Sequence, residues 1–235
     1  MCPRRHGKTM PATAGGKALP REITHLVSVR DERQNQLPAS IALVMDLTDS
    51  VAPDEFRGML PILSEIDGCL TSGHYFAALT LALTLPDVCV SLGSGPDGPT
   101  VKAGKVSQLY KQWCSDNLDE SASLDPELCW DLRNGAVHEA TLRLKGYQQI
   151  VFSTPDSRIS VHGVSVVSGA ITVLHMDIAQ CCHALVTAAQ RWLHAQRRDP
   201  IVESGLRRMV RRVEYAFPLV SGGFVDAYVS ITDPA

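Results

Sequence analysis

The residues best suited to chemistry are an arginine and a histidine, Arg133 and His138, which lie five positions apart near the end of a predicted short helix. Arginine carries a permanent positive charge and suits phosphate, while histidine takes up or releases a proton near neutral pH. Cleavage of a phosphodiester needs both properties, because charge develops on the phosphate while a proton moves. The pair therefore indicates phosphodiester chemistry, and the functional hypothesis depends on the helix that presents it.

That helix has a clear predicted start. Asp125 can accept hydrogen bonds from free backbone N–H groups, and Pro126 suits the first helical position. At about 100° per residue, the apolar residues that follow form one stripe toward the core. Arg133, Asn134 and His138 fall on the face that points away from this stripe. The stripe consists of Leu128, Cys129, Leu132 and Ala136. The charged Glu139 would also fall on this apolar stripe, so we expect the helix to end near that residue.

Two apolar residues, Trp130 and Val137, lie among the polar residues of the outward face. A tryptophan beside a valine is poorly suited to water, so we expect this face to meet another element or a second subunit. A symmetric contact there would bring two copies of the polar residues together. We therefore predict a homodimer with Trp130 and Val137 at its interface.

The composition limits the class of protein. The 235 residues fit one domain with tails, and a hydrophobic content of 45% can fill a core. The net charge of −3 argues against a chain that binds nucleic acid through overall basicity, so contact with RNA would need a local basic patch. Seven cysteines without a C-x-x-C pair favour a reducing cytoplasm, with neither disulfides nor a metal or cofactor site. The apolar runs predict no membrane span, and no signal peptide is evident, so the expected location is cytoplasmic.

The hydrophobic pattern predicts a mainly α protein, a helical bundle with a small β-hairpin insertion. Residues 1–50 share no helical period and are expected to form a poorly ordered extension. The helical domain is expected at 51–215. Pro61 should kink its first helix or reset its start, Pro86 should end or bend the second, and residues 91–100 are predicted as a Gly/Pro loop.

The β insertion is predicted at about residues 148–173. The runs 149–153 and 163–167 are rich in residues that favour strands, and they flank a turn sequence at 155–157. These two runs are therefore expected to pair with each other as a hairpin.

Two helices are predicted after the insertion, one beginning at about Leu174 and a last one running from Asp199 through Val213. Residues 216–235 are expected to form a C-terminal tail or a short strand against the hairpin. The last helix would carry the densest group of basic residues on one face, opposite its apolar side. This group suggests a track for the phosphate backbone of RNA, although a solvated helix face is the alternative. Its members are Arg207, Arg208, Arg211 and Arg212.

Two further patterns do not support a site. Residues 93–98 match G-x-G-x-x-G, but Pro96 removes an N–H donor and no βαβ unit surrounds the match, so a turn-rich loop is expected. A second group of residues has side chains that bind metals, but its members diverge around a helix, which favours core packing. The group consists of His175, Cys181, Cys182 and His183.

The segment Asp131-Leu132-Arg133-Asn134-Gly135-Ala136-Val137-His138-Glu139 resembles the R-x4–6-H motif of the HEPN superfamily. A polar residue directly after the arginine, here Asn134, is typical of that family. The order and character of the preceding helices are also similar, and the resemblance covers roughly residues 52–215. It implies a HEPN-like helical bundle that works as a dimer, with the motif at a shared cleft.

The resemblance also implies an activity, metal-independent cleavage of RNA. His138 would be the general base that takes the proton of the ribose 2′-OH, and Arg133 would bind the scissile phosphate. Asn134 would orient the histidine or the phosphate. The products would be a 2′,3′-cyclic phosphate and a 5′-OH, and no cofactor would take part.

Two alternatives stay open. Many members of that family are catalytically inactive and serve as RNA-binding or protein-interaction modules, and some have an antitoxin-like protein partner. A purely structural role is the other alternative. In that case Arg133 would pair with Asp131, Glu127 or a neighbouring helix, and His138 would close the helix C-terminus, where a positive charge is favoured.

Overall fold

The protein was analysed as a computed structural model. The described residues are 58–95, 104–142 and 144–209, together with the backbone of strands at 27–29, 211–216 and 224–229. The predicted extension, residues 1–50, lies outside the described residues except for the strand at 27–29.

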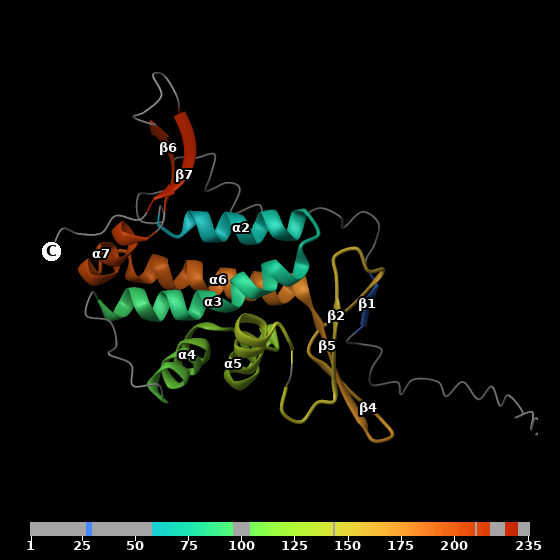
Figure 1. The fold of residues 1–235 in the computed structure, drawn as a ribbon. Helices are drawn as coiled ribbons and strands as arrows, with labels where there is room; N and C mark the ends of the chain where they lie inside the picture. The colour runs from blue at the N-terminus through green and yellow to red at the C-terminus, as the bar shows by residue number, and fades with distance from the viewer. Residues whose placement is uncertain are drawn as a thin grey trace, which may run out of the picture.

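The described residues are mainly helical, with a small three-stranded sheet at one end of the bundle (Figure 1), as the hydrophobic pattern predicts. The α-helices are α2 (Leu60–Thr71), α3 (Tyr75–Ser94), α4 (Gly104–Asn117), α5 (Pro126–Asn134), α6 (Ile178–Gln196) and α7 (Pro200–Arg208). The strands are β1 (Val27–Val29), β2 (Gln149–Ser153), β3 (Ile159–Val161), β4 (Val164–Ser168), β5 (Ile171–Asp177), β6 (Arg211–Ala216) and β7 (Phe224–Val229).

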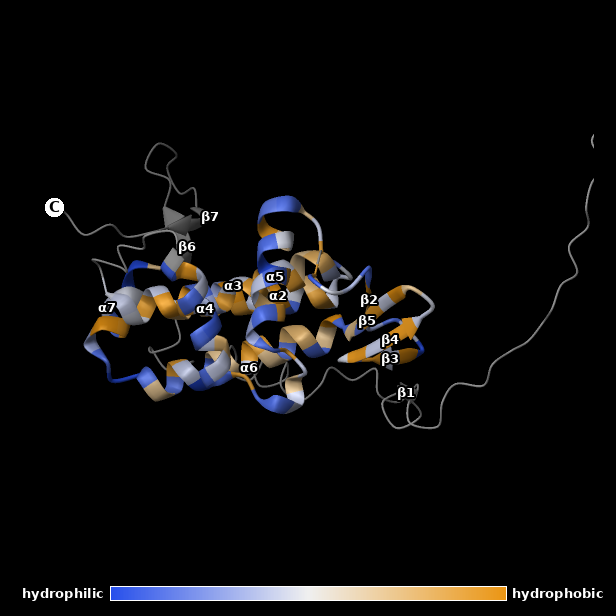
Figure 2. Cartoon of the chain, turned by 90° about the horizontal axis from the view of Figure 1, so that it is seen from below, coloured by the Kyte–Doolittle hydropathy of each residue, from blue (hydrophilic) through white to orange (hydrophobic). Residues whose placement is uncertain are grey.

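Helix α3 is the centre of the bundle and packs against α2, α4, α5, α6 and α7. Figure 2 shows hydrophobic residues along α3, between the more polar outer helices. Among the described residues, α3 alone is long and apolar enough to cross a membrane by length and composition, a feature that the sequence analysis did not identify. The central position of α3 is a sufficient reason for that composition. The cytoplasmic location stays a prediction.

Two prolines, Pro61 and Pro86, lie within helices of the bundle. Pro61 lies in the first turn of α2, so it resets the start of that helix as expected. Pro86 does not end the second helix, because α3 continues through this residue to Ser94, so residues 91–94 of the predicted loop are helical. Residues 96–100 of that loop lie outside the described residues. A proline removes one backbone hydrogen bond from a helix, but the buried residues Cys89 and Leu92 hold the later turns of α3 against the core.

The three-stranded sheet has the order β2-β5-β4, which corrects the predicted hairpin between residues 149–153 and 163–167. Strand β2 pairs in parallel with β5, and the hairpin is formed by β4 and β5. Residues 171–177 form β5, so α6 begins at Ile178 and not at Leu174. A period-two and a helical pattern both fit a short apolar run such as this one, and only pairing with β2 and β4 decides between them.

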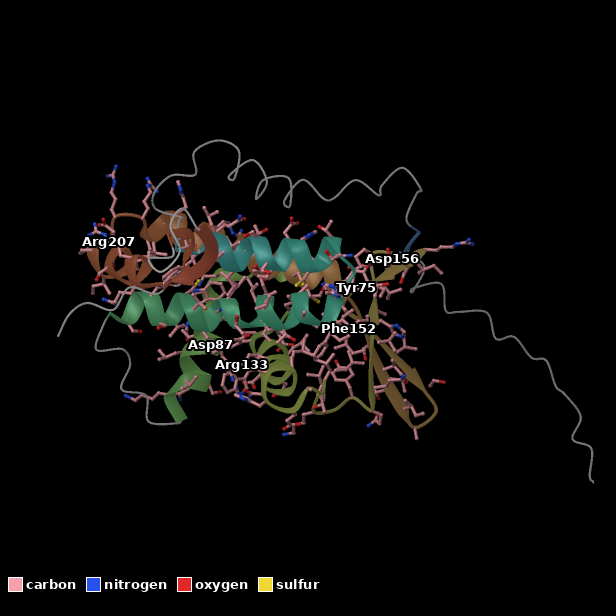
Figure 3. All side chains as sticks on the ribbon, turned by 45° about the horizontal axis from the view of Figure 1, so that its top comes forward. Tyr75, Asp87, Arg133, Phe152, Asp156 and Arg207 are labelled. Carbon is pink, nitrogen blue, oxygen red and sulfur yellow. The ribbon has the colours of Figure 1, made fainter. Side chains whose placement is uncertain are left out.

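Polar contacts attach the sheet to the bundle. The hydroxyl of Tyr75, at the start of α3, donates a hydrogen bond to the Asp156 carboxylate at 2.6 Å, in the turn between β2 and β3 (Figure 3). On the helix side of the sheet, Leu174 and Met176 of β5 are buried in the same hydrophobic core as the helices. The sheet and the helices therefore share one hydrophobic core.

The last helix is shorter than predicted. Helix α7 ends at Arg208, and the chain then forms β6, which pairs antiparallel with β7. The run Arg-Arg-Val-Glu-Tyr contains residues that favour strands, and its pairing with 224–229 prevails over the helical pattern that suggested a helix through Val213. The C-terminal residues thus include a strand as expected, but its partner is β6 and not the sheet hairpin.

His183 on α6 predicts a pH-dependent stability. Burial lowers the pKa of this imidazole below its usual value of 6.5, and its Nε2 atom has no hydrogen-bond partner among the described residues. The folded protein therefore favours the neutral form, so the stability linked to this group is present above pH 6.5 and is lost as the pH falls below it. We expect the urea midpoint of His183→Gln to fall less than that of the parent protein between neutral and acidic pH. The exposed His194 provides the control His194→Gln, and equal slopes for the parent and His183→Gln would contradict the prediction.

Candidate functional site

Helix α5 begins as the sequence predicts. The carboxylate of Asp125 accepts a hydrogen bond from the backbone N–H of Leu128 at 2.9 Å, and Pro126 occupies the first turn. Cys129 and Leu132 are fully buried on the predicted core stripe. The start of the helix and its buried face are therefore confirmed, and they fix which residues point away from the core.

The end of the helix differs from a regular α-helix. Residues Gly135–Glu139 form a π-helical turn, which ends at Glu139 where the helix was expected to end. In an α-helix, side chains five positions apart point about 140° away from each other. A π-helix instead bonds residue i to residue i+5, so these positions lie nearly one above the other. The π turn therefore brings His138 next to Arg133.

The Arg133 side chain makes polar contacts in three directions. Its Nε donates to the Asp87 carboxylate on α3 at 2.8 Å, which forms an ion pair. Its Nη1 donates to Oδ1 of Asn134 at 3.0 Å and lies 2.7 Å from Nε2 of His138. The structure thus brings together all three residues that the sequence predicts as catalytic, and it adds Asp87. In the view of Figure 3, Asp87 and Arg133 lie between α3 and α5.

The contact between Arg133 and His138 defines the hydrogen-bonding state of the imidazole. A guanidinium can only donate, so the Nε2 atom of His138 must accept, and the proton of the neutral ring is then on Nδ1. The His138 side chain is exposed, whereas the Arg133 side chain is 17% exposed. His138 therefore lies at the surface with its Nε2 lone pair accepting a hydrogen bond from the Arg133 guanidinium.

The Arg133 guanidinium has one nitrogen that these contacts do not use. Nε and Nη1 are occupied by the contacts above, and Nη2 has no hydrogen-bond partner among the described residues. An oxyanion such as a phosphate could accept hydrogen bonds from Nη2 without first displacing Asp87.

The ring of Trp130 packs against the guanidinium of Arg133. The guanidinium carbon of Arg133 lies 5.4 Å from the centre of the Trp130 ring, which is the geometry of a cation–π contact. The Trp130 ring packs edge-on against Tyr110 of α4 at 5.3 Å. The expectation that this face meets another element is thus confirmed for Trp130, which is partly buried within its own chain. Val137 is 39% exposed, and its place at a dimer interface stays a prediction.

Two residues of this site were missed from the sequence, Asp87 and Tyr110. Asp87 is the one charged residue in the whole of α3, and a lone acid in an apolar central helix is a signal that it has a basic partner. Tyr110 is buried, and its hydroxyl donates to the Leu83 carbonyl at 2.9 Å, while burial raises its pKa. Tyr110 therefore packs under the site as a neutral residue and holds α4 to α3.

The predicted arginine track does not form on one helix face. Arg207 pairs with Glu203, and Arg208 donates to the Ser204 hydroxyl at 3.0 Å, both within α7. Arg211 and Arg212 belong to β6, whose side chains lie outside the described part of the structure. The arrangement of all four on a single helix is therefore wrong, because the helix ends at Arg208.

A cavity nevertheless lies between α7 and the arginine site. It has a volume of about 490 Å³, and its walls include Asp87 and Val88 of α3, Arg208 at the end of α7, and Met209. Asp87 thus contacts Arg133 on one side and lines this cavity on the other. A larger cavity of about 920 Å³ lies at the start of α5, but its charged lining is mostly acidic. That lining includes Asp119, Glu120, Asp125, Glu127, Asp131 and one cation, Lys145, so it does not suit phosphate.

Among the described residues, no group of three or more His, Cys, Asp or Glu side chains could hold a metal ion. The buried thiols behave as core residues, since burial raises the pKa of both Cys181 and Cys182. Comparison with known proteins gives no match to a family model, to a curated protein or to a solved structure.

Proposed function

We propose that the protein is a HEPN-like, metal-independent endoribonuclease whose reaction is carried by Arg133, Asn134 and His138. The observation that supports this proposal most directly is the 2.7 Å contact between Nη1 of Arg133 and Nε2 of His138 at the protein surface. It joins a permanent cation to a neutral imidazole, and these are the two groups that cleavage of a ribose phosphodiester needs.

In the proposed reaction, a non-bridging phosphate oxygen accepts hydrogen bonds from the free Nη2 edge of Arg133. The guanidinium then turns toward the phosphate, and Nε2 of His138 takes the proton of the 2′-OH. The 2′-oxygen attacks phosphorus, the bond from phosphorus to the 5′-oxygen breaks, and the 5′-oxygen takes a proton from a water molecule. The hydroxide that remains takes the proton from His138, which restores the base. Asn134 holds the guanidinium through its Oδ1 atom. The products are a 2′,3′-cyclic phosphate and a 5′-OH.

The substrate we propose is RNA, with Arg208 at the far wall of the 490 Å³ cavity as a second phosphate contact. The proposal includes a homodimer through the exposed Val137 side of η5, the π turn Gly135–Glu139, a cytoplasmic location and an antitoxin-like protein partner. These features follow from the resemblance of residues 131–139 to the HEPN motif.

A catalytically inactive HEPN-like RNA-binding or protein-interaction module is the second candidate function. The ion pair between Arg133 and Asp87 favours it, because this carboxylate already neutralises the cation that a phosphate would need. The two candidates differ in one respect, whether the RNA phosphate can draw Arg133 away from His138.

Cleavage of structured RNA in EDTA tests the proposal. We expect the parent protein to cut the RNA and to leave 2′,3′-cyclic phosphate and 5′-OH ends. EDTA should not prevent this cleavage, because the imidazole of His138 takes the proton without help from a metal ion. His138→Ala should bind RNA but cut it about 100-fold or more slowly, since the proton acceptor is gone. His194→Ala removes an exposed histidine elsewhere and should cut normally.

Two results would contradict the enzyme. Equal cleavage by the parent protein and His138→Ala would assign the activity to other residues or to a contaminant. RNA binding without cleavage by any of the three proteins would favour the inactive module.

A further inference from the structure

Among the described residues, strand β4 forms an unprotected edge of the three-stranded sheet. In the sheet order β2-β5-β4, the only partner of β4 among the described residues is β5. Alternate residues of such a strand direct their N–H and C=O groups away from the sheet, where they can pair with another strand. Proteins usually protect an edge of this kind with a lysine, a proline or a bulge. The sequence of β4, Val-Ser-Val-Val-Ser, contains no charge and no proline, and its register with β5 is continuous.

The exposed apolar side chains of the protein concentrate near this edge. Of the large hydrophobic residues that are exposed in the described structure, the three with the highest exposed fractions all belong to the strands β3, β4 and β5. They are Val167 at 70%, Ile159 at 52% and Ile171 at 49%. In Figure 1 the β4–β5 hairpin extends away from the helices, and Figure 2 shows hydrophobic residues on β4 at the outside of the molecule. Both the backbone and the side chains of the hairpin are thus suited to burial.

We propose that β4 pairs antiparallel with β4 of a second copy of this chain, about a two-fold axis that passes beside Val166. In this register Val166 lies opposite the partner subunit's Val166, and Ser165 lies opposite the partner subunit's Val167. Side chains of Ser165 and Val167 share one face of the strand, so the pairing keeps the same face of each sheet continuous with its copy. The two three-stranded sheets then form one sheet of six strands.

A second copy fits β4 better than a strand of another protein for two reasons. The strand has no charged residue with which to select a charged partner, and it meets its own copy without repulsion between like charges. A two-fold antiparallel pair is also self-complementary, since each strand offers the other the same donors and acceptors. This contact involves neither Trp130 nor Val137, so it does not depend on the proposed ribonuclease activity.

Charge substitutions at Val166 test the proposal by sedimentation equilibrium of the full chain over a wide concentration range. Each variant is made on a chain that carries Val137→Glu, because this substitution removes the contact proposed on the α5 side, and this starting protein should reach twice the chain mass of 25.5 kDa. Val166→Lys and Val166→Glu should each be monomeric at the same concentrations, because two like charges would face each other across the axis. An equimolar mixture of the two variants should regain the dimer mass, because the charges are then opposite. Ile201→Lys changes an exposed residue of α7 and should leave the mass unchanged.

The mixture keeps the test valid even if lysine at Val166 weakens folding, because regained dimer mass shows that both variants fold. Val167→Lys, at a position that is 70% exposed, gives a second disruption that leaves the sheet interior intact. A parent protein that stays monomeric would overturn the proposal. So would a chain that is a dimer without Val137→Glu but a monomer with it, which would assign dimerisation to the α5 side. Loss of RNA cleavage with the β4 dimer intact would refute only the ribonuclease.

Discussion

Asp177→Ala is expected to lower the free energy of unfolding by about 3 kcal/mol, the largest loss of stability that we predict for a polar residue. Asp177 is fully buried where β5 meets α6. Its carboxylate accepts a hydrogen bond from the backbone N–H of Gln180 at 3.0 Å, which caps α6, and another from the Ser160 hydroxyl of β3. Alanine removes the cap and leaves the buried Ser160 O–H without the carboxylate that accepts its hydrogen bond, although Gln180 still donates to the Ser160 oxygen at 3.2 Å. Urea unfolding of the purified variant measures the loss.

Asp199→Ala provides the matched control. Asp199 caps α7 through the backbone N–H of Ile201 at 2.8 Å, but it lies nearer the surface and this cap stands without a buried hydroxyl beside it. Its loss should cost about 1 kcal/mol, the usual value for a helix cap. Equal losses for Asp177→Ala and Asp199→Ala would mean that the buried hydrogen bond from Ser160 to Asp177 contributes nothing to stability.

The same junction positions the helix of the candidate site. The backbone N–H of Asp177 donates to Nδ1 of His162 at 3.1 Å, and Nε2 of His162 donates to the Ala122 carbonyl at 2.7 Å. Ala122 lies in the short 3-10 helix Glu120–Ala122, just before Asp125 caps α5. The sheet therefore holds the beginning of α5 through hydrogen bonds, while Asp87 holds its end through Arg133.

Local signals in the sequence were sufficient for the start of α5 and for its two faces. Asp125 and Pro126 each act within one turn of the chain, so their effect does not depend on distant residues. The outward face of Arg133 follows from the buried positions of Cys129 and Leu132, which repeat at helical spacing.

Contacts between distant segments decided what the sequence did not predict. The π turn at Gly135–Glu139 changes which side chains meet, although the residue types alone fit an α-helix equally well. The pairing of β5 with β2 and the pairing of β6 with β7 both replaced expected helix. Asp87 lies 46 positions before Arg133, so only the packing of α3 on α5 makes it part of the site.

A double-mutant cycle on Arg133 and His138 should show that the two side chains act as one unit. We expect Arg133→Ala and His138→Ala each to lower the rate of RNA cleavage by about 100-fold or more. Because Nη1 of Arg133 lies 2.7 Å from Nε2 of His138, removal of either residue changes the position or the charge of the other. The double variant should therefore be little slower than the slower of the two single variants. Single-turnover kinetics on one RNA measures all four rates.

The magnitude of the coupling decides between two views of the site. If the two losses multiply in the double variant, Arg133 and His138 contribute independently, and the contact between them is incidental to cleavage. Arg191→Ala is the matched control for charge, because Arg191 is also a guanidinium in an ion pair, with Asp119, and is 51% exposed away from His138. A rate loss in Arg191→Ala equal to that in Arg133→Ala would mean that cleavage depends on total positive charge. Normal cleavage by Arg191→Ala, together with losses that do not multiply, would instead place the chemistry on the contact between Arg133 at the end of α5 and His138 in the π turn.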